Sequence, residues 1–131
     1  MAQMLTHSQE CSNMDLYDFK SHSALGSFGG EGSSSWGVVL EGGREFVAIG
    51  QQDGTAFAEI SSEGKLVYLG RLPQQSVWSI WREIRSYKNY MIIGSEAVGH
   101  GVQVRHCLSL GKRRQRTNKN LDLRYEQAAY H

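Results

Sequence analysis

The chain has 131 residues, with 14 Lys plus Arg against 13 Asp plus Glu, 15 Gly and one Pro. This length suits one ordinary domain, and the balanced charge gives the whole chain no general attraction to nucleic acid or acidic membranes. No apolar stretch approaches the ~18 residues that a transmembrane helix requires, so we expect short strands joined by turns.

The first 31 residues are expected to form an extension that precedes the strands. Residues 1–10 have neither a basic start nor an apolar stretch of secretory length, so no signal peptide is visible. Cys11 and Cys107 lie far apart in the sequence and define no disulfide framework. Their redox state and the compartment of the protein therefore stay open.

Residues 32–73 read as a first module of four strands. Gly-rich or charged turns separate the apolar runs, and the Asp53-Gly54 pair suits a tight hairpin because Gly accepts positive φ. Four antiparallel strands in a meander make one blade of a β-propeller. The expected strands are 34–40, 46–49, 55–60 and 65–72.

Residues 74–104 read as a second, incomplete module, with strands expected at 79–85, 90–94 and 101–104. The run 90–94 matches the run 46–50 position for position, and Trp36 and Trp81 are separated by 45 positions. That spacing falls within the period of propeller blades. The predicted fold class is all-β: a partial β-propeller of about two antiparallel blades.

A small β-sandwich or an open sheet is the alternative fold. A strand of a sandwich has one solvent-exposed face, so polar and apolar residues should alternate along it. The runs 46–49 and 90–93 are instead apolar at consecutive positions. Such runs favour strands covered on both faces, as in stacked blades.

A charge break marks residues 105–131, which hold seven basic and two acidic residues and few apolar ones. We expect a basic tail of low order, disordered or weakly helical. Its basic run could attract RNA through counterion release, but no interleaved aromatic residues could stack bases. No nucleic-acid partner is therefore predicted.

Motifs in the same order along residues 11–104 resemble the choice-of-anchor B family of LVIVD-repeat proteins, in particular its fungal members. The motifs are Asp15-Leu16-Tyr17, Ser21-His22, and the stretches 32–37, 43–50, 53–60, 68–73, 79–84, 87–90 and 99–104. The resemblance implies a propeller-type fold in a secreted or surface-associated protein of unassigned activity. It supplies no catalytic residues.

Two departures from that family suggest a fragment. Relatives continue after the position of Val104 into a Phe-Asp pair and further repeats, whereas this chain continues with Arg105-His106-Cys107. Relatives also carry a leader ahead of the Cys11 region. We therefore expect truncation at both ends, with a tail that arises from a frame change or a retained intron.

Candidate site residues are few. His22, Asp53, Glu96 and His100 could form a loop site, and Asp15, Asp18 and His106 complete the possible metal or acid–base set. The spacings fit neither zinc nor a calcium loop, so no catalytic residue, cofactor or metal is predicted. We expect Asp53 to hold a turn and His100 to lie in a surface loop.

Other motifs favour structural roles. The run Ser33-Ser34-Ser35 lacks a nucleophile-elbow pattern and is expected to be only the approach to the strand at 34–40. No helix follows the Gly-rich stretch 26–32 to hold a phosphate. His106 and Cys107 are adjacent on an extended chain and point to opposite faces. The three Trp residues are expected to pack between sheets; they are Trp36, Trp78 and Trp81.

The functional hypothesis is a non-enzymatic repeat-domain fragment with a protein- or ligand-interaction role. Two blades leave apolar faces and strand edges open, so we expect marginal stability and a protein partner or self-association. One alternative is a hydrolase-like fragment whose His22, Asp53 and His100 converge in one pocket at the propeller mouth. Another is a mis-predicted reading frame without a function of its own.

Overall fold

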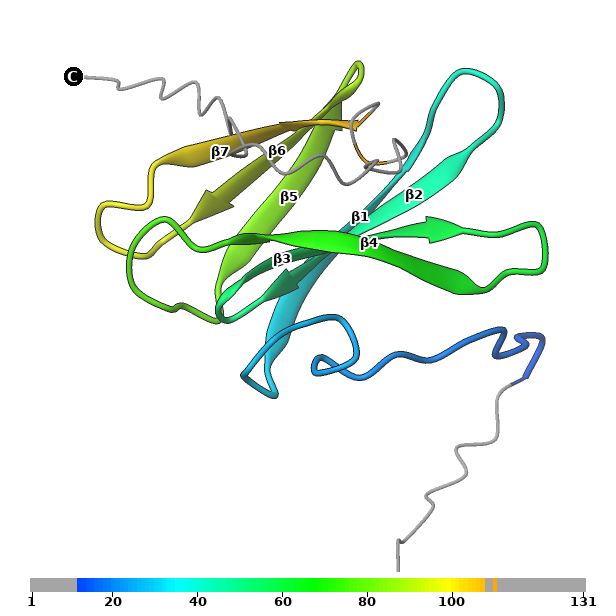
Figure 1. Ribbon diagram of the computed structural model, residues 1–131, viewed down its shortest axis with the longest axis horizontal. Coiled ribbons are helices and arrows are strands. Elements are labelled where there is room, and N and C mark those ends of the chain that lie inside the picture. The colour runs from blue at the N-terminus through cyan, green and yellow to red at the C-terminus, as the bar shows by residue number, and fades with distance from the viewer. Residues whose placement is uncertain (1–11, 108–109, 111–131) are drawn as a thin grey trace, which may run out of the picture.

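The computed structural model describes residues 12–107 and residue 110, and these form seven strands in two antiparallel sheets (Figure 1). The first sheet has the order β1-β2-β3-β4 and the second the order β5-β6-β7. The described part contains no helix, and so none that could cross a membrane. The strands are β1 (Gly32–Val39), β2 (Glu45–Gln51), β3 (Gly54–Ile60), β4 (Leu66–Pro73), β5 (Arg82–Tyr87), β6 (Tyr90–Ser95) and β7 (Val102–His106).

The hairpin between β2 and β3 is the tightest connection in the first sheet. Gln51 pairs with Gly54, so only Gln52 and Asp53 form the loop. Gly54 has a φ of +152°, and a Cβ placed there would lie 2.4 Å from the carbonyl oxygen of Leu72. This position therefore requires glycine, both for its backbone conformation and for the close approach of β4.

The two sheets meet along β1 and β5, which run in the same direction. The Ser33 hydroxyl accepts from the Arg82 amide at 3.0 Å, and the Ser34 hydroxyl accepts from the Ile84 amide at 3.2 Å. Farther along, the Trp36 indole donates to the Ser86 hydroxyl at 2.8 Å. Side-chain groups of β1 thus bond to the edge of β5 and protect both edges from pairing elsewhere.

A single core fills the space between the sheets. It is made of one face of each sheet, because side chains alternate along every strand. Trp36, Val38, Leu69 and Leu110 pack against its margin while they remain partly exposed. The buried members are Leu40, Phe46, Ala48, Phe57, Leu72, Ile84, Met91, Ile93 and Cys107.

Equivalent positions of the two sheets point in the same direction along the stack. Phe46 and Ala48 of β2 face the second sheet, and the matching positions of β6 in the repeat are Tyr90 and Ile92. Those two side chains lie on the face of the second sheet that points away from the first, while Met91 and Ile93 fill the core. The face of the second sheet that carries Tyr90 and Ile92 is therefore not covered by another sheet of the described residues.

Residues 12–31 run along the side of the first sheet that faces away from the second (Figure 1). The Asp18 carboxylate accepts from the Leu66 amide at 2.9 Å, and the Gly26 carbonyl accepts from Arg71 at 2.8 Å. This segment therefore covers β4.

The connection from β4 to β5 is fastened at both ends to the same hairpin loop. The Gln74 amide donates to the Asp53 carbonyl at 3.2 Å, and the Ser79 amide donates to the Gln52 carbonyl at 3.0 Å. Between these two anchors the side chains of Val77 and Trp78 are exposed.

The seven expected strands and the all-β class are confirmed, but two expectations are wrong. The described strands form two antiparallel sheets of four and three strands, with no closed or propeller arrangement among them. The run 90–93 is covered on one face only, because only one sheet packs against it. Trp36 and Trp81 are not equivalent, since Trp36 lies inside β1 whereas Trp81 precedes β5.

Candidate functional site

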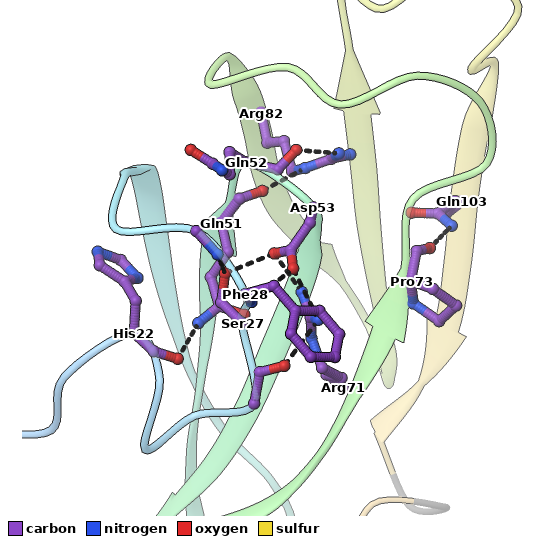
Figure 2. A network of polar contacts seen from close by, with 12 residues as sticks. His22, Ser27, Phe28, Gln51, Gln52, Asp53, Arg71, Pro73, Arg82 and Gln103 are labelled. Atoms are coloured by element: carbon purple, nitrogen blue, oxygen red, sulfur yellow. Dashed lines mark hydrogen bonds and ion pairs between the residues drawn. The ribbon is translucent and has the colours of Figure 1, made fainter.

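The four candidate residues lie at one end of the sheet pair, around the β2–β3 hairpin loop. Figure 2 shows two of them, His22 and Asp53. The four come from three segments: His22 from the extension before β1, Asp53 from the hairpin loop, and both Glu96 and His100 from the loop between β6 and β7. Gln51 and Gln52 link these segments. Their carbonyl groups accept from Arg82, and the Gln51 side-chain amide donates to the His22 carbonyl.

Asp53 is the most heavily bonded of the four. Its carboxylate accepts from the Ser27 hydroxyl at 2.6 Å, from the Phe28 amide at 2.9 Å and from Arg71 at 2.5 Å (Figure 2). Burial opposes ionisation of this group, but the bonds from Arg71, Ser27 and the Phe28 amide outweigh burial and hold the pKa of Asp53 below its ordinary value. The expectation that Asp53 holds a turn agrees with this geometry.

His100 is buried against Arg82, which corrects the expectation of a surface loop histidine. Its Nε2 lies 2.8 Å from Nη1 of Arg82, and its Nδ1 lies 3.0 Å from the Gly101 carbonyl. Arginine can only donate, so Nε2 must accept and Nδ1 carries the proton. His100 therefore serves as a neutral acceptor for a buried cation.

Arg82 fastens this end of the structure across the two sheets. Its Nε donates to the Gln51 carbonyl at 2.7 Å and its Nη2 to the Gln52 carbonyl at 3.3 Å (Figure 2). Burial lowers the pKa of Arg82, and the positive charge of Arg71 adds to that effect, while the negative charge of Asp53 opposes it. The acceptors of the Arg82 guanidinium are the Gln51 and Gln52 carbonyls and His100. Asp53 attracts the guanidinium electrostatically without a direct hydrogen bond.

His22 and Glu96 stand apart from these bonds. The His22 carbonyl accepts from the Gln51 side-chain amide at 3.2 Å, while the imidazole Nδ1 is buried without a hydrogen bond to any described residue. Glu96 is exposed and accepts from the Ser79 hydroxyl at 3.3 Å. Neither side chain contributes a charge to the pair formed by Asp53 and Arg71.

The arrangement is that of a structural clamp. Within residues 12–107, no hydrogen bond joins any two of the four candidates; each is bonded to a different partner. A general base needs a free acceptor within reach of a reacting group, and the acceptors of Asp53 and His100 are already occupied. No three His, Cys, Asp or Glu side chains of the described part lie together as a metal site.

The remaining candidates are scattered. Asp18 bonds to Lys20 and to the Leu66 amide, which lowers its pKa to about 2. His106 packs edge-on against Tyr90, with ring centroids 4.8 Å apart. Cys107 is fully buried, and burial raises the pKa of its thiol, so it is not an activated nucleophile. Asp15 is exposed.

Three sequence expectations outside the cluster need correction. The strand expected from Ser34 begins earlier, at Gly32, so the whole serine run belongs to β1, and the hydroxyl groups of Ser33 and Ser34 join the two sheets. Trp78 and Trp81 are exposed, because both lie in the irregular connection ahead of β5. Only Trp36 packs against the core, where the Arg85 guanidinium lies 4.6 Å from its ring.

Sequence reasoning missed the residues that hold the cluster together, namely Arg71, Ser27 and the two glutamines of the hairpin. The burial of Arg82, in contrast, could have been predicted from the alternation of residues along its strand. In the alternating strand it shares the parity of Ile84, and that parity places it on the buried face.

Comparison with protein-family models, with curated proteins and with solved structures finds no match for this chain.

Proposed function

We propose that this chain is a non-enzymatic interaction module: a fragment of about two blade-like sheets from a propeller-type repeat protein of the LVIVD kind. Its function is to bind a protein through the uncovered face of the second sheet. That face, called the outer face below, is formed by the outward side chains of Glu83, Arg85, Tyr87, Tyr90, Ile92, Val102, Val104 and His106.

The observation that carries the proposal is the difference in burial between equivalent positions of the two sheets. Phe46 and Ala48 are 1% and 0% exposed, whereas their repeat partners Tyr90 and Ile92 are 43% and 36% exposed. Val104, which corresponds to the buried Phe57, is 49% exposed. Residues that contact a neighbouring sheet in one repeat thus have no sheet packed on them, within the described part of the chain, in the other.

Cross-strand pairing makes these side chains contiguous. Ile92 lies opposite Val104, and Tyr90 lies opposite His106. On the other side of β6, Tyr87 lies opposite Tyr90. A continuous apolar patch across three strands is typical of a binding surface in a protein of this size.

The bonding of the candidate cluster supports a binding role over catalysis. Asp53 and His100 spend their acceptors on Arg71 and Arg82, so a hydrolase would have to break the clamp that fastens the hairpin. We infer that the cluster serves stability. Replacement of Asp53 or His100 by Ala should then lower the free energy of unfolding, and it should not change any hydrolytic rate measured for the folded chain.

Site-specific photo-crosslinking tests the binding role. A benzophenone amino acid at position 92 of the full chain, expressed in its native cells, should crosslink to one discrete protein. The same group at position 39 is the control, because Val39 is 65% exposed on the far side of the first sheet. Equal crosslinking from both positions, or none from position 92, would overturn the proposal.

A further inference from the structure

We propose that His100 is a pH-sensitive switch: its protonation breaks the bond to Arg82 and releases the β6–β7 loop, residues 96–101, from the rest of the molecule. In acid this loop opens while both sheets stay folded. The inference goes beyond the proposed function, because it involves none of the side chains of the outer face.

His100 is the one buried residue of this loop. Its side chain is 4% exposed, whereas the other five positions are exposed or half-buried. A Cβ at Gly99 or Gly101 would meet nothing within 4 Å, so the loop is loosely packed on both sides of His100. The exposed Glu96 adds a bond of 3.3 Å from the Ser79 hydroxyl. The attachment of the loop therefore depends mainly on the bond between His100 and Arg82.

That bond requires a neutral imidazole. The Nδ1 of His100 donates to the Gly101 carbonyl at 3.0 Å, and its Nε2 accepts from Nη1 of Arg82 at 2.8 Å. Arginine stays protonated and can only donate. A second proton on His100 would place two donors and two positive charges 2.8 Å apart in a site from which water is largely excluded. The protonated imidazole therefore has to leave this site.

The charges around the bond do not offset a second positive charge. Arg82 on β5 contacts His100 directly, and Asp53 of the hairpin and Arg71 on β4 act on Arg82 electrostatically. These are two cations and one anion, and Asp53 is already paired with Arg71. Glu96, the acid of the loop itself, is exposed. Among the described residues, no carboxylate forms an ion pair with Arg82.

Release of the loop leaves the other contacts of this end in place. Nε and Nη2 of Arg82 still donate to the carbonyls of Gln51 and Gln52, and the hydroxyl groups of Ser33 and Ser34 still join β1 to β5. We therefore expect local opening instead of unfolding.

The size of the effect follows from the uptake of one proton. The open state binds a proton that the closed state excludes, so acid favours opening. Because an exposed histidine titrates near pH 6.5, the equilibrium constant for opening should rise about twentyfold from about pH 7 to about pH 5.

Hydrogen exchange of the Ala97 and His100 amides, followed by NMR on the full chain, measures this opening. These amides donate to the Ser95 hydroxyl and to the Ala97 carbonyl. After correction for the intrinsic exchange rate, their protection should fall about twentyfold from about pH 7 to about pH 5, while the amides of the central strand β3 keep theirs.

His100→Gln should abolish this loss of protection, because glutamine offers Arg82 an acceptor and binds no proton. His22→Gln is the matched control and should retain the loss, since His22 is a histidine at the same end whose printed bond is made by its carbonyl.

A second measurement needs no variant and covers the case in which His100→Gln does not fold. The nitrogen NMR shifts of the His100 imidazole in the wild-type chain should show a proton on Nδ1 and none on Nε2 at neutral pH. A proton on Nε2, equal protection of the loop at both pH values, a loss that persists in His100→Gln, or an equal loss in β3 overturns the inference. The crosslink from position 92 tests the proposed function separately.

Discussion

Replacement of Asp53 by Asn tests whether the hairpin clamp holds the fold. The carboxylate accepts bonds from Ser27, the Phe28 amide and Arg71, and the substitution removes its charge while it keeps nearly the same shape. Hydrogen bonds to charged groups contribute about 1.5–3 kcal/mol. Because the Arg71–Asp53 pair is partly exposed, we expect a loss near the lower end, about 2 kcal/mol of unfolding free energy at neutral pH.

The pH dependence of that loss identifies its cause. The pKa of folded Asp53 lies below its ordinary value of 3.8, so at acidic pH the unfolded chain binds a proton that the folded chain does not. The contribution is fully present above about pH 5 and is lost as the pH falls through 3.8 toward the folded pKa. The difference between wild type and Asp53→Asn should therefore shrink on acidification.

Urea unfolding followed by Trp fluorescence measures this difference at about pH 7 and at about pH 3. Other carboxylates with lowered pKa values, such as Asp18 and Glu59, are common to both proteins and cancel in the comparison. A difference below about 0.5 kcal/mol at neutral pH, or one that is equal at both pH values, would refute the clamp. A double-mutant cycle with Arg71→Gln then isolates the ion pair from the other bonds.

Three further predictions concern the core, the hairpin and the thiol. Ile93→Ala should cost about 3 kcal/mol in urea unfolding, because the side chain is fully buried between the sheets; a cost below about 1 kcal/mol would contradict that packing. Gly54→Ala should cost more than Gly99→Ala, since both have positive φ but only the first meets another strand; equal losses would argue against the close approach. In a Cys11→Ser background, Cys107 should react with a thiol reagent only after urea unfolds the chain, and rapid labelling of the folded chain would show that the thiol is accessible.

Strand positions were predictable because local chemistry decides them. Apolar runs bounded by Gly and Asp fixed the seven strands within a few residues, and the repeat between 46–50 and 90–94 indicated that the second module copies the first. The exposed outer face was also foreseeable, since a repeat expected at the end of the described strands has no further sheet there to cover it.

Burial and pairing between distant segments were not predictable from the sequence. Arg82 and His100 are separated by 18 positions and meet only because the β6–β7 loop folds back over the start of β5. Asp53 and Arg71 meet because β3 and β4 are antiparallel neighbours whose register places them at the same end. The exposure of Trp78 follows from the path of an irregular connection, which carries no periodic signal.

The fastening of the β4–β5 connection at both ends has a consequence for chain continuity. Gln74 and Ser79 are each hydrogen-bonded to the β2–β3 hairpin loop. The two ends of the segment between them are therefore kept close together by bonds outside that segment. Insertions there would cost little closure entropy, and new termini at Val77 would leave the sheets joined through β1 and β5. We therefore expect the bonds between β1 and β5 to keep the two sheets in place even when the chain is cut within the β4–β5 connection.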